Sequence, residues 1–154
     1  MKYAASYRVN EDLTLYATQA AGYRPGGNQA PLPPFCSSDE AAQANFSRRF
    51  NSDEAETTEF GVKARGENYT ANVTYFDVDW DGIIIQVTPG CGWRYNFNGG
   101  KAETSGWEFD FTYAVNDSVS LDFAGSTMTA ETSIDIASLG ASAGDRLPNT
   151  VEKQ

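Results

Sequence analysis

Apolar and polar residues alternate along most of this chain, in stretches separated by very short polar turns and by long segments rich in Gly, Pro and Ser. The alternation is clearest between residues 101 and 115, where aromatic side chains occupy every second position: Trp107, Phe109, Phe111 and Tyr113. Successive side chains of a β-strand point to opposite faces, so a period of two predicts strands with one apolar and one polar face.

This pattern predicts six strands, at residues 3–9, 13–23, 57–65, 69–87, 101–115 and 119–129. Tight turns at 10–12, 66–68 and 116–117 join them into three hairpins. The longer connections are expected at 24–56, 88–100 and 130–154, and the four prolines between residues 25 and 34 should break regular structure in the first of them. The expected fold is therefore all-β, an antiparallel up-and-down meander formed by residues 1–154.

Every short turn falls at one end of this meander and every long loop at the other, which is typical of a segment of a transmembrane β-barrel. The alternative is a small soluble antiparallel β-module of the carbohydrate-binding type, because six strands with turn signals also suit a soluble sandwich or barrel. A sandwich has no reason to collect its long loops at one end, so the asymmetry favours the barrel. In a barrel, Glu108 and Asp110 should face the lumen, since a carboxylate in hydrocarbon costs several kcal/mol.

Composition narrows the range of functions. The mean hydropathy of -0.47 excludes a transmembrane helix of about 20 apolar residues. The net charge of -10 opposes nucleic-acid binding, and the absence of His removes the usual general base and the commonest metal ligand. Glu108 and Asp110 could resemble a glycosidase pair, but alternation explains both and nothing supplies a substrate cleft. We therefore expect neither an enzyme nor a cofactor.

The two ends of the chain also carry information. Met1 and Lys2 are followed at once by strand-like sequence, without the apolar stretch of a signal peptide, and residues 144–154 have the composition of a loop leading to a further strand. We expect the chain to be an internal piece of a larger protein. A gene piece without a function of its own, with aggregation-prone sheet edges, is a third hypothesis.

Five short motifs follow one another along this pattern: GYRPGG at 22–27, EFGVK at 59–63, FDVDWD at 76–81, NGGKA with GWE within 98–108, and GDRLPN at 144–149. In this order they resemble the C-terminal barrel region of TonB-dependent outer-membrane receptors, the siderophore-receptor type in particular. The resemblance implies a barrel of about 22 strands around an N-terminal plug. It also implies contact with outer-membrane lipid, uptake of a ferric siderophore or similar nutrient, and engagement of the TonB complex through a plug region that these residues lack.

Ligand contacts are expected from the outer loops. Tyr23 and Arg24 lie where the second strand ends, and the second loop holds the aromatic and basic cluster Trp93, Arg94 and Tyr95. An Arg beside aromatic rings suits an anionic or catecholate-bearing ligand, through charge pairing and stacking. The alternative role for all five is packing within the loops and at the membrane girdle.

The fourth strand carries Asp77, Asp79 and Asp81 before Gly82, a spacing that copies the start of an EF-hand calcium loop. The twelfth position is Thr88 instead of a bidentate Glu, and the preceding residues follow a strand period. We therefore expect no metal site there and interpret the three residues as weak candidates on one face of a rim strand.

The same strand changes phase at the adjacent pair Tyr75 and Phe76. This change predicts either a β-bulge or a crossing from the bilayer to the outer rim.

Cys36 and Cys91 fall in two long loops on the same side of the meander. In an oxidising exterior a disulfide between them would tie the loops together, and two unpaired thiols are the alternative. The distance between their Cα atoms decides between the two.

Overall fold

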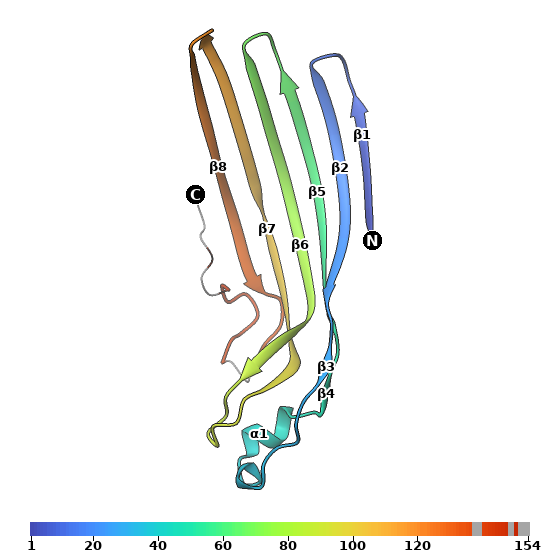
Figure 1. Ribbon diagram of the computed structural model, residues 1–154, viewed down its shortest axis with the longest axis vertical. Coiled ribbons are helices and arrows are strands. Elements are labelled where there is room, and N and C mark those ends of the chain that lie inside the picture. The colour runs from blue at the N-terminus through green and yellow to red at the C-terminus, as the bar shows by residue number, and fades with distance from the viewer. Residues whose placement is uncertain (137–139, 148–149, 151–154) are drawn as a thin grey trace.

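The computed structural model describes residues 1–136, 140–147 and 150, and it confirms the antiparallel meander (Figure 1). Six strands form one sheet in the order β1-β2-β5-β6-β7-β8. Their bounds are β1 Lys2–Arg8, β2 Leu13–Arg24, β5 Asp53–Arg65, β6 Tyr69–Val87, β7 Tyr95–Asn116 and β8 Val119–Thr132. Three tight turns lie at the upper end of Figure 1, and the long loops gather at the lower end.

The strands extend further toward the loop end than the alternation predicts. β5 begins at Asp53 instead of residue 57, and β7 begins at Tyr95 instead of residue 101. The extra residues pair with the long strand β6, in the register Glu54 to Asp81 and Val87 to Tyr95. Backbone pairing with β6 sets these boundaries, and it leaves the second loop with only residues 88–94.

The first long connection contains regular structure that the prolines did not predict. A short strand pair, β3 Gly27–Asn28 with β4 Arg49–Phe50, encloses the 3₁₀ turn η1 Pro34–Cys36 and the helix α1 Glu40–Asn45. Pro34 is accommodated in the first turn of η1, where its missing N–H is not needed. Within the part of the chain that the structure describes, no helix is long and apolar enough to cross a membrane.

One face of the sheet, which we call the apolar face, carries large unburied hydrophobic side chains. The register places Tyr7, Leu15, Val62, Val73 and Phe109 side by side across five strands. Several residues of this face are more than half exposed: Tyr3, Tyr7, Phe60, Trp107, Leu121 and Phe123. An apolar patch of this extent requires a cover.

The opposite face, which we call the polar face, carries Glu108 and Asp110, as expected because they flank Phe109 in the strand and so point away from the apolar face. On this face Tyr16 lies over Gly61, its partner on β5, and a Cβ at Gly61 would overlap the Tyr16 ring. The Tyr16 hydroxyl lies 2.6 Å from Oγ1 of Thr74. The glycine therefore provides space for an aromatic ring that ties β2, β5 and β6 together.

The sheet continues without interruption through Tyr75 and Phe76, where β6 changes phase. Pairing with β5 is unbroken from Glu54 opposite Asp81 to Arg65 opposite Thr70. Of the two alternatives, a β-bulge at Tyr75 and Phe76 is therefore wrong, and a crossing from the bilayer to the outer rim stays a prediction. The register shifts lie later, between Trp80 and Ile84 on the β7 side, where Gly82 has a φ of 63°.

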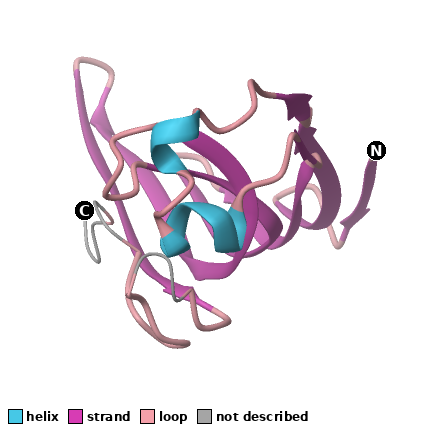
Figure 2. Cartoon of the chain, turned by 90° about the horizontal axis from the view of Figure 1, so that it is seen from below, coloured by secondary structure: helices cyan, strands magenta, loops and turns pink. Residues whose placement is uncertain are grey.

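Figure 2, which views the chain from the loop end, shows a curved sheet with the helical turns lying across its end. The described residues form this sheet and the two-stranded β3–β4 pair, with no second layer packed on the apolar face. A sandwich buries the inner faces of two sheets against each other, so the hypothesis of a small sandwich module is wrong.

Candidate ligand-binding site

The outer loops form a packed unit, which we call the outer-loop module and define as residues 25–52 together with 83–100. A disulfide joins Cys36 to Cys91, with the two Cα atoms 5.3 Å apart. Asp39 adds a second link: its carboxylate caps α1 by accepting from the backbone N–H of Ala42 and also accepts from that of Cys91, at 2.7 Å. These backbone donors, that of Ala42 first, lower the pKa of Asp39. The module is therefore cross-linked by a covalent bond and a carboxylate.

Two side-chain amides extend this cross-linking toward the sheet. Gln29 donates to the carbonyl of Asn96 at 2.7 Å and accepts from its N–H at 2.8 Å, as a strand partner would. Asn98 accepts from the N–H of Asn51 and donates to the carbonyls of Asn51 and Gly82. The first loop is thus hydrogen-bonded to β7 near both of its ends.

Tyr95, one of the expected ligand contacts, lies inside this module. Its side chain is 3% exposed, its hydroxyl donates to the carbonyl of Ala41 at 3.2 Å, and its ring meets Phe46 edge-on at 5.5 Å. Burial, followed by the charge of Asp39, raises the pKa of its hydroxyl. The structure therefore gives Tyr95 a packing role.

Arg24 occupies a different position, on the polar face at the loop end. It pairs with Asp53, whose side chain is 1% exposed, while its own side chain remains 53% exposed. Its guanidinium carbon lies 4.9 Å from the centre of the Trp80 ring. The result is a cation held against an aromatic ring with part of its surface open to solvent.

Asp53 fixes this arrangement. Its carboxylate accepts from the side chain and backbone of Arg24 and from the N–H of Ile84 at 3.1 Å. These hydrogen bonds, that of the Arg24 side chain first, lower the pKa of Asp53 from 3.8 to about 2. Sequence reasoning missed both partners of Arg24. The sequence did carry a signal for Trp80, because Trp80 belongs to the apolar residues of β6 that have the parity of the polar face.

The remaining expected contacts are dispersed. Tyr23 is 76% exposed and lies on the other face of the sheet from Arg24, where its partner in the strand register is Glu54 of β5. Trp93 is half-buried and Arg94 is exposed in the loop before β7. The structure therefore does not gather the five residues into one site, and it pairs Arg24 with Trp80 instead.

Beyond the apolar face, toward the loop end, the same side of the sheet becomes acidic. Asp77, Asp79 and Asp81 lie on this side, as their parity with Tyr75 requires. Their neighbours in the register are also acidic: Glu54, Glu56 and Glu103. Among the described residues, no group of three or more His, Cys, Asp or Glu side chains is positioned to hold a metal ion.

Comparison with known proteins agrees with this geometry. Residues 2–154 match the family model of the TonB dependent receptor-like β-barrel. The ferric yersiniabactin uptake receptor FyuA from Yersinia pestis superposes with a TM-score of 0.75 and 20% identity, over 99% of this chain and 21% of its own. The ferric-catecholate import receptor Fiu from E. coli K12 superposes with a TM-score of 0.65 and 22% identity, over 99% of this chain and 20% of the receptor. The siderophore receptor PirA from Pseudomonas aeruginosa superposes with a TM-score of 0.60 and 18% identity, over 86% of this chain and 28% of the receptor.

The chain thus spans between about a fifth and somewhat over a quarter of these three receptors. Its two-faced sheet, with short turns at one end and cross-linked loops at the other, corresponds to a section of their barrel wall. This chain belongs to the TonB-dependent receptor β-barrel family.

Proposed function

We propose that these residues form part of the wall and outer loops of an outer-membrane receptor that takes up a ferric siderophore or a similar nutrient. The apolar face suits contact with lipid, and the polar face suits a water-filled or plug-filled lumen. The names of the three matched receptors support the ligand class, and engagement of TonB would use a plug region outside these residues.

The observation that carries the ligand proposal is the contact of Arg24 with Trp80. A half-exposed guanidinium on an aromatic ring offers charge, hydrogen-bond donors and a stacking surface to an anionic or catecholate-bearing ligand. Asp53 neutralises part of the charge, but it also removes the freedom of the Arg24 side chain, so less entropy is lost when a ligand binds. Tyr23, Trp93 and Arg94 remain candidates for secondary contacts.

Uptake of radioactive iron tests this proposal. Cells that lack their own siderophore receptors would express the natural gene product carrying these residues and receive catecholate, hydroxamate and phenolate ferric siderophores in turn. Arg24→Lys keeps the charge beside Asp53 but loses the planar donor fork, so we expect ligand affinity to fall about tenfold, equivalent to about 1.4 kcal/mol. Arg48→Lys, an exposed change in the first loop, is the matched control.

Surface abundance measured by antibody labelling separates binding from folding. Uptake of none of the ferric ligands, with the receptor present at the surface, would contradict the siderophore proposal. Unchanged affinity in Arg24→Lys would remove Arg24 from the ligand site.

A further inference from the structure

Asn98 joins the first outer loop to two strands at the loop end of the sheet. Its side-chain nitrogen donates to the carbonyl of Gly82 at 2.7 Å and to that of Asn51 at 3.0 Å, and its Oδ1 accepts from the Asn51 N–H at 2.6 Å. Carbonyl oxygens only accept and an N–H only donates, so these partners fix the orientation of the amide. No other side chain of this size offers the same set of donors and acceptors.

The amide lies where the strand ladder is irregular. Pairing between β6 and β7 shifts register between Trp80 and Ile84, and Gly82 in this stretch has a φ of 63°. A register shift interrupts the ladder, and the Asn98 side chain supplies a donor to the Gly82 carbonyl there. The same side chain holds the backbone of Asn51, just before β5. It therefore fastens the first loop to β6 and β7 at one point.

Asn98 is followed by Gly99, and an asparagine before a glycine is chemically reactive. The backbone nitrogen of Gly99 attacks Cγ of Asn98, because no Cβ shields that nitrogen. As the new C–N bond forms, the bond from Cγ to the side-chain nitrogen breaks, and ammonia leaves with the proton from Gly99. Water then opens the resulting succinimide to aspartate or isoaspartate. The amide is lost, a negative charge is gained, and asparagine is heat-labile for this reason.

The fold requires both members of this reactive pair. A Cβ at Gly99 would overlap the ring of Phe97, and the register of β7 leaves Gly99 between two paired residues, as in a bulge. Packing therefore keeps the glycine, and the contacts with the first loop keep the amide of Asn98.

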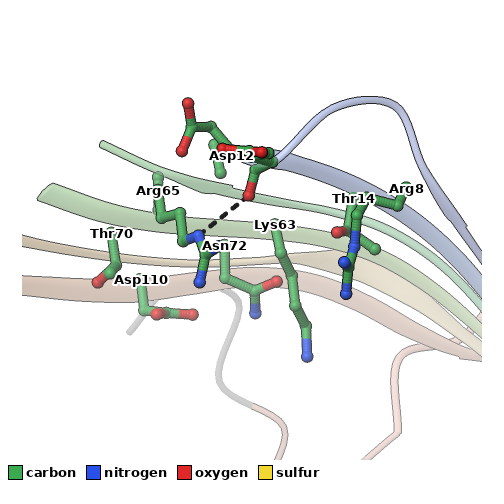
Figure 3. Close-up of a pocket in the computed structure, with 11 residues that line it drawn as sticks. Arg8, Asp12, Thr14, Lys63, Arg65, Thr70, Asn72 and Asp110 are labelled. Atoms are coloured by element: carbon green, nitrogen blue, oxygen red, sulfur yellow. Dashed lines mark hydrogen bonds between the residues drawn. The ribbon is translucent and has the colours of Figure 1, made fainter. Parts of the chain in front are cut away.

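The folded structure also restrains the reaction. An extended strand holds the next backbone nitrogen away from the side chain, and the hydrogen bonds to Asn51 and Gly82 hold Cγ of Asn98 in place. Asn72 of β6, which lines the hollow at the short-turn end in Figure 3, is the converse case. Its buried Oδ1 has no hydrogen-bond partner among the described residues, but its neighbour Val73 is branched and shields the backbone nitrogen.

We propose that Asn98 is a modification site, at which deamidation follows opening of the outer-loop module and prevents the first loop from fastening again. The product carboxylate has no hydrogen to donate, and its charge would face the carbonyl oxygens of Asn51 and Gly82. The reaction needs only water and is irreversible, so an opening that allows attack is recorded in the covalent structure. The contacts and the chemistry are independent of the ligand proposed above.

Peptide mapping by mass spectrometry tests the first half of this proposal. The natural gene product carrying these residues is kept in detergent at mildly alkaline pH, beside a synthetic peptide of residues 94–103. We expect Asn98 to deamidate at least about tenfold more slowly in the protein than in the peptide, because the reaction requires local opening. Cys36→Ser/Cys91→Ser removes the cross-link of the module and should raise the rate in the protein by about threefold or more. Asn72 is the internal reference and should keep its amide in both proteins.

Hydrogen exchange tests the consequence for the loop. Asn98→Asp has the side chain of one hydrolysis product, and we expect the Asn51 amide to exchange at least about tenfold faster, with unchanged exchange in the middle of β5. Asn28→Asp adds the same charge to an exposed side chain of the first loop and is the matched control. Circular dichroism establishes that each variant keeps its β-structure.

Each of four results would overturn the proposal. Equal rates in the protein and the peptide would show that the contacts of Asn98 do not restrain the reaction. An unchanged rate in Cys36→Ser/Cys91→Ser would separate the reaction from opening of the module, and deamidation of Asn72 at the rate of Asn98 would remove the role of Gly99. Equal exchange at the Asn51 amide in Asn98→Asp and its control would show that the amide does not fasten the loop.

Discussion

At the scale of single residues, Asp53 connects the half-exposed Arg24 to the strands. Its carboxylate is almost completely buried and is held by charge-assisted hydrogen bonds. Such a group stabilises the fold only while it is ionised.

Asp53 predicts an acid transition in the surroundings of Trp80. Because the pKa of Asp53 is lowered from 3.8 to about 2, its contribution is fully present above pH 3.8 and is lost as the pH falls through about 2. The shift corresponds to about 2 kcal/mol. In Trp93→Phe/Trp107→Phe, Trp80 alone reports by fluorescence, and we expect a midpoint near pH 2 that is absent from the same protein with Asp53→Asn. A midpoint at or above 3.8 would contradict the burial of this ion pair.

Gly61 predicts a second effect at this scale. Gly61→Val would place methyl groups where the Tyr16 ring lies, which would break the Tyr16 contact with Thr74 and move Lys63. We expect a loss of about 1–3 kcal/mol in the free energy of unfolding, measured by denaturant titration in detergent. Gly22→Ala is the matched control, since a Cβ there meets nothing within 4 Å, and it should change stability by less than about 0.5 kcal/mol. Similar losses in both variants would show that the effect comes from strand glycine in general.

At the scale of elements, alternation predicts strands where only one face is apolar. It identified β1, β2 and β6 to within one residue at either end, because polar turns bound these strands on at least one side. It failed at the start of β7, where Gly99 and Gly100 interrupt the pattern and the backbone is paired with β6.

The contacts of the candidate site were less accessible to sequence reasoning. Arg24 was identified from its local neighbours, but its partners Asp53 and Trp80 lie 29 and 56 residues further along the chain and meet it only through the strand register. Tyr95 shows the converse, because its aromatic and basic neighbourhood suggested a ligand contact and tertiary packing buried it. Local composition therefore identified candidate residues, and strand pairing together with loop packing determined their contacts.

The disulfide predicts the behaviour of the outer-loop module. Cys36→Ser/Cys91→Ser removes a cross-link between residues 55 positions apart. In the chain-entropy model such a cross-link adds about 4 kcal/mol to the free energy of unfolding. This is an upper bound, because the paired strands already bring the two ends of the loop together. We expect faster hydrogen exchange at amides of α1, such as that of Gln43, with unchanged exchange at amides in the middle of β5. Equal acceleration in β5 would mean that the disulfide stabilises the whole sheet. Unchanged exchange in α1 would mean that Asp39 and the amide contacts suffice.

At the scale of the whole molecule, the sheet presents two faces with different requirements. On the apolar face, Phe60, Trp107 and Phe123 each expose more than half of their maximum solvent-accessible surface, and the rest of the described chain does not cover them. The sheet order also leaves β1 and β8 as the two outermost strands of the described sheet. Both features are stable when lipid covers the face and further strands cover the edges.

The solubility of the isolated chain follows from this architecture and separates the membrane-wall interpretation from that of an independent soluble domain. Apolar surface of this extent in water favours association, and unpaired strand edges provide a template for it. We expect residues 1–154 to sediment as aggregates in buffer, and to remain dispersed in detergent with the far-UV circular dichroism of β-structure. Detergent can cover the apolar face but cannot pair the edges, so thermal unfolding in micelles should be broad. A monodisperse, sharply melting monomer in plain buffer would contradict the membrane-wall interpretation, because it would require the apolar face to be covered from within the chain.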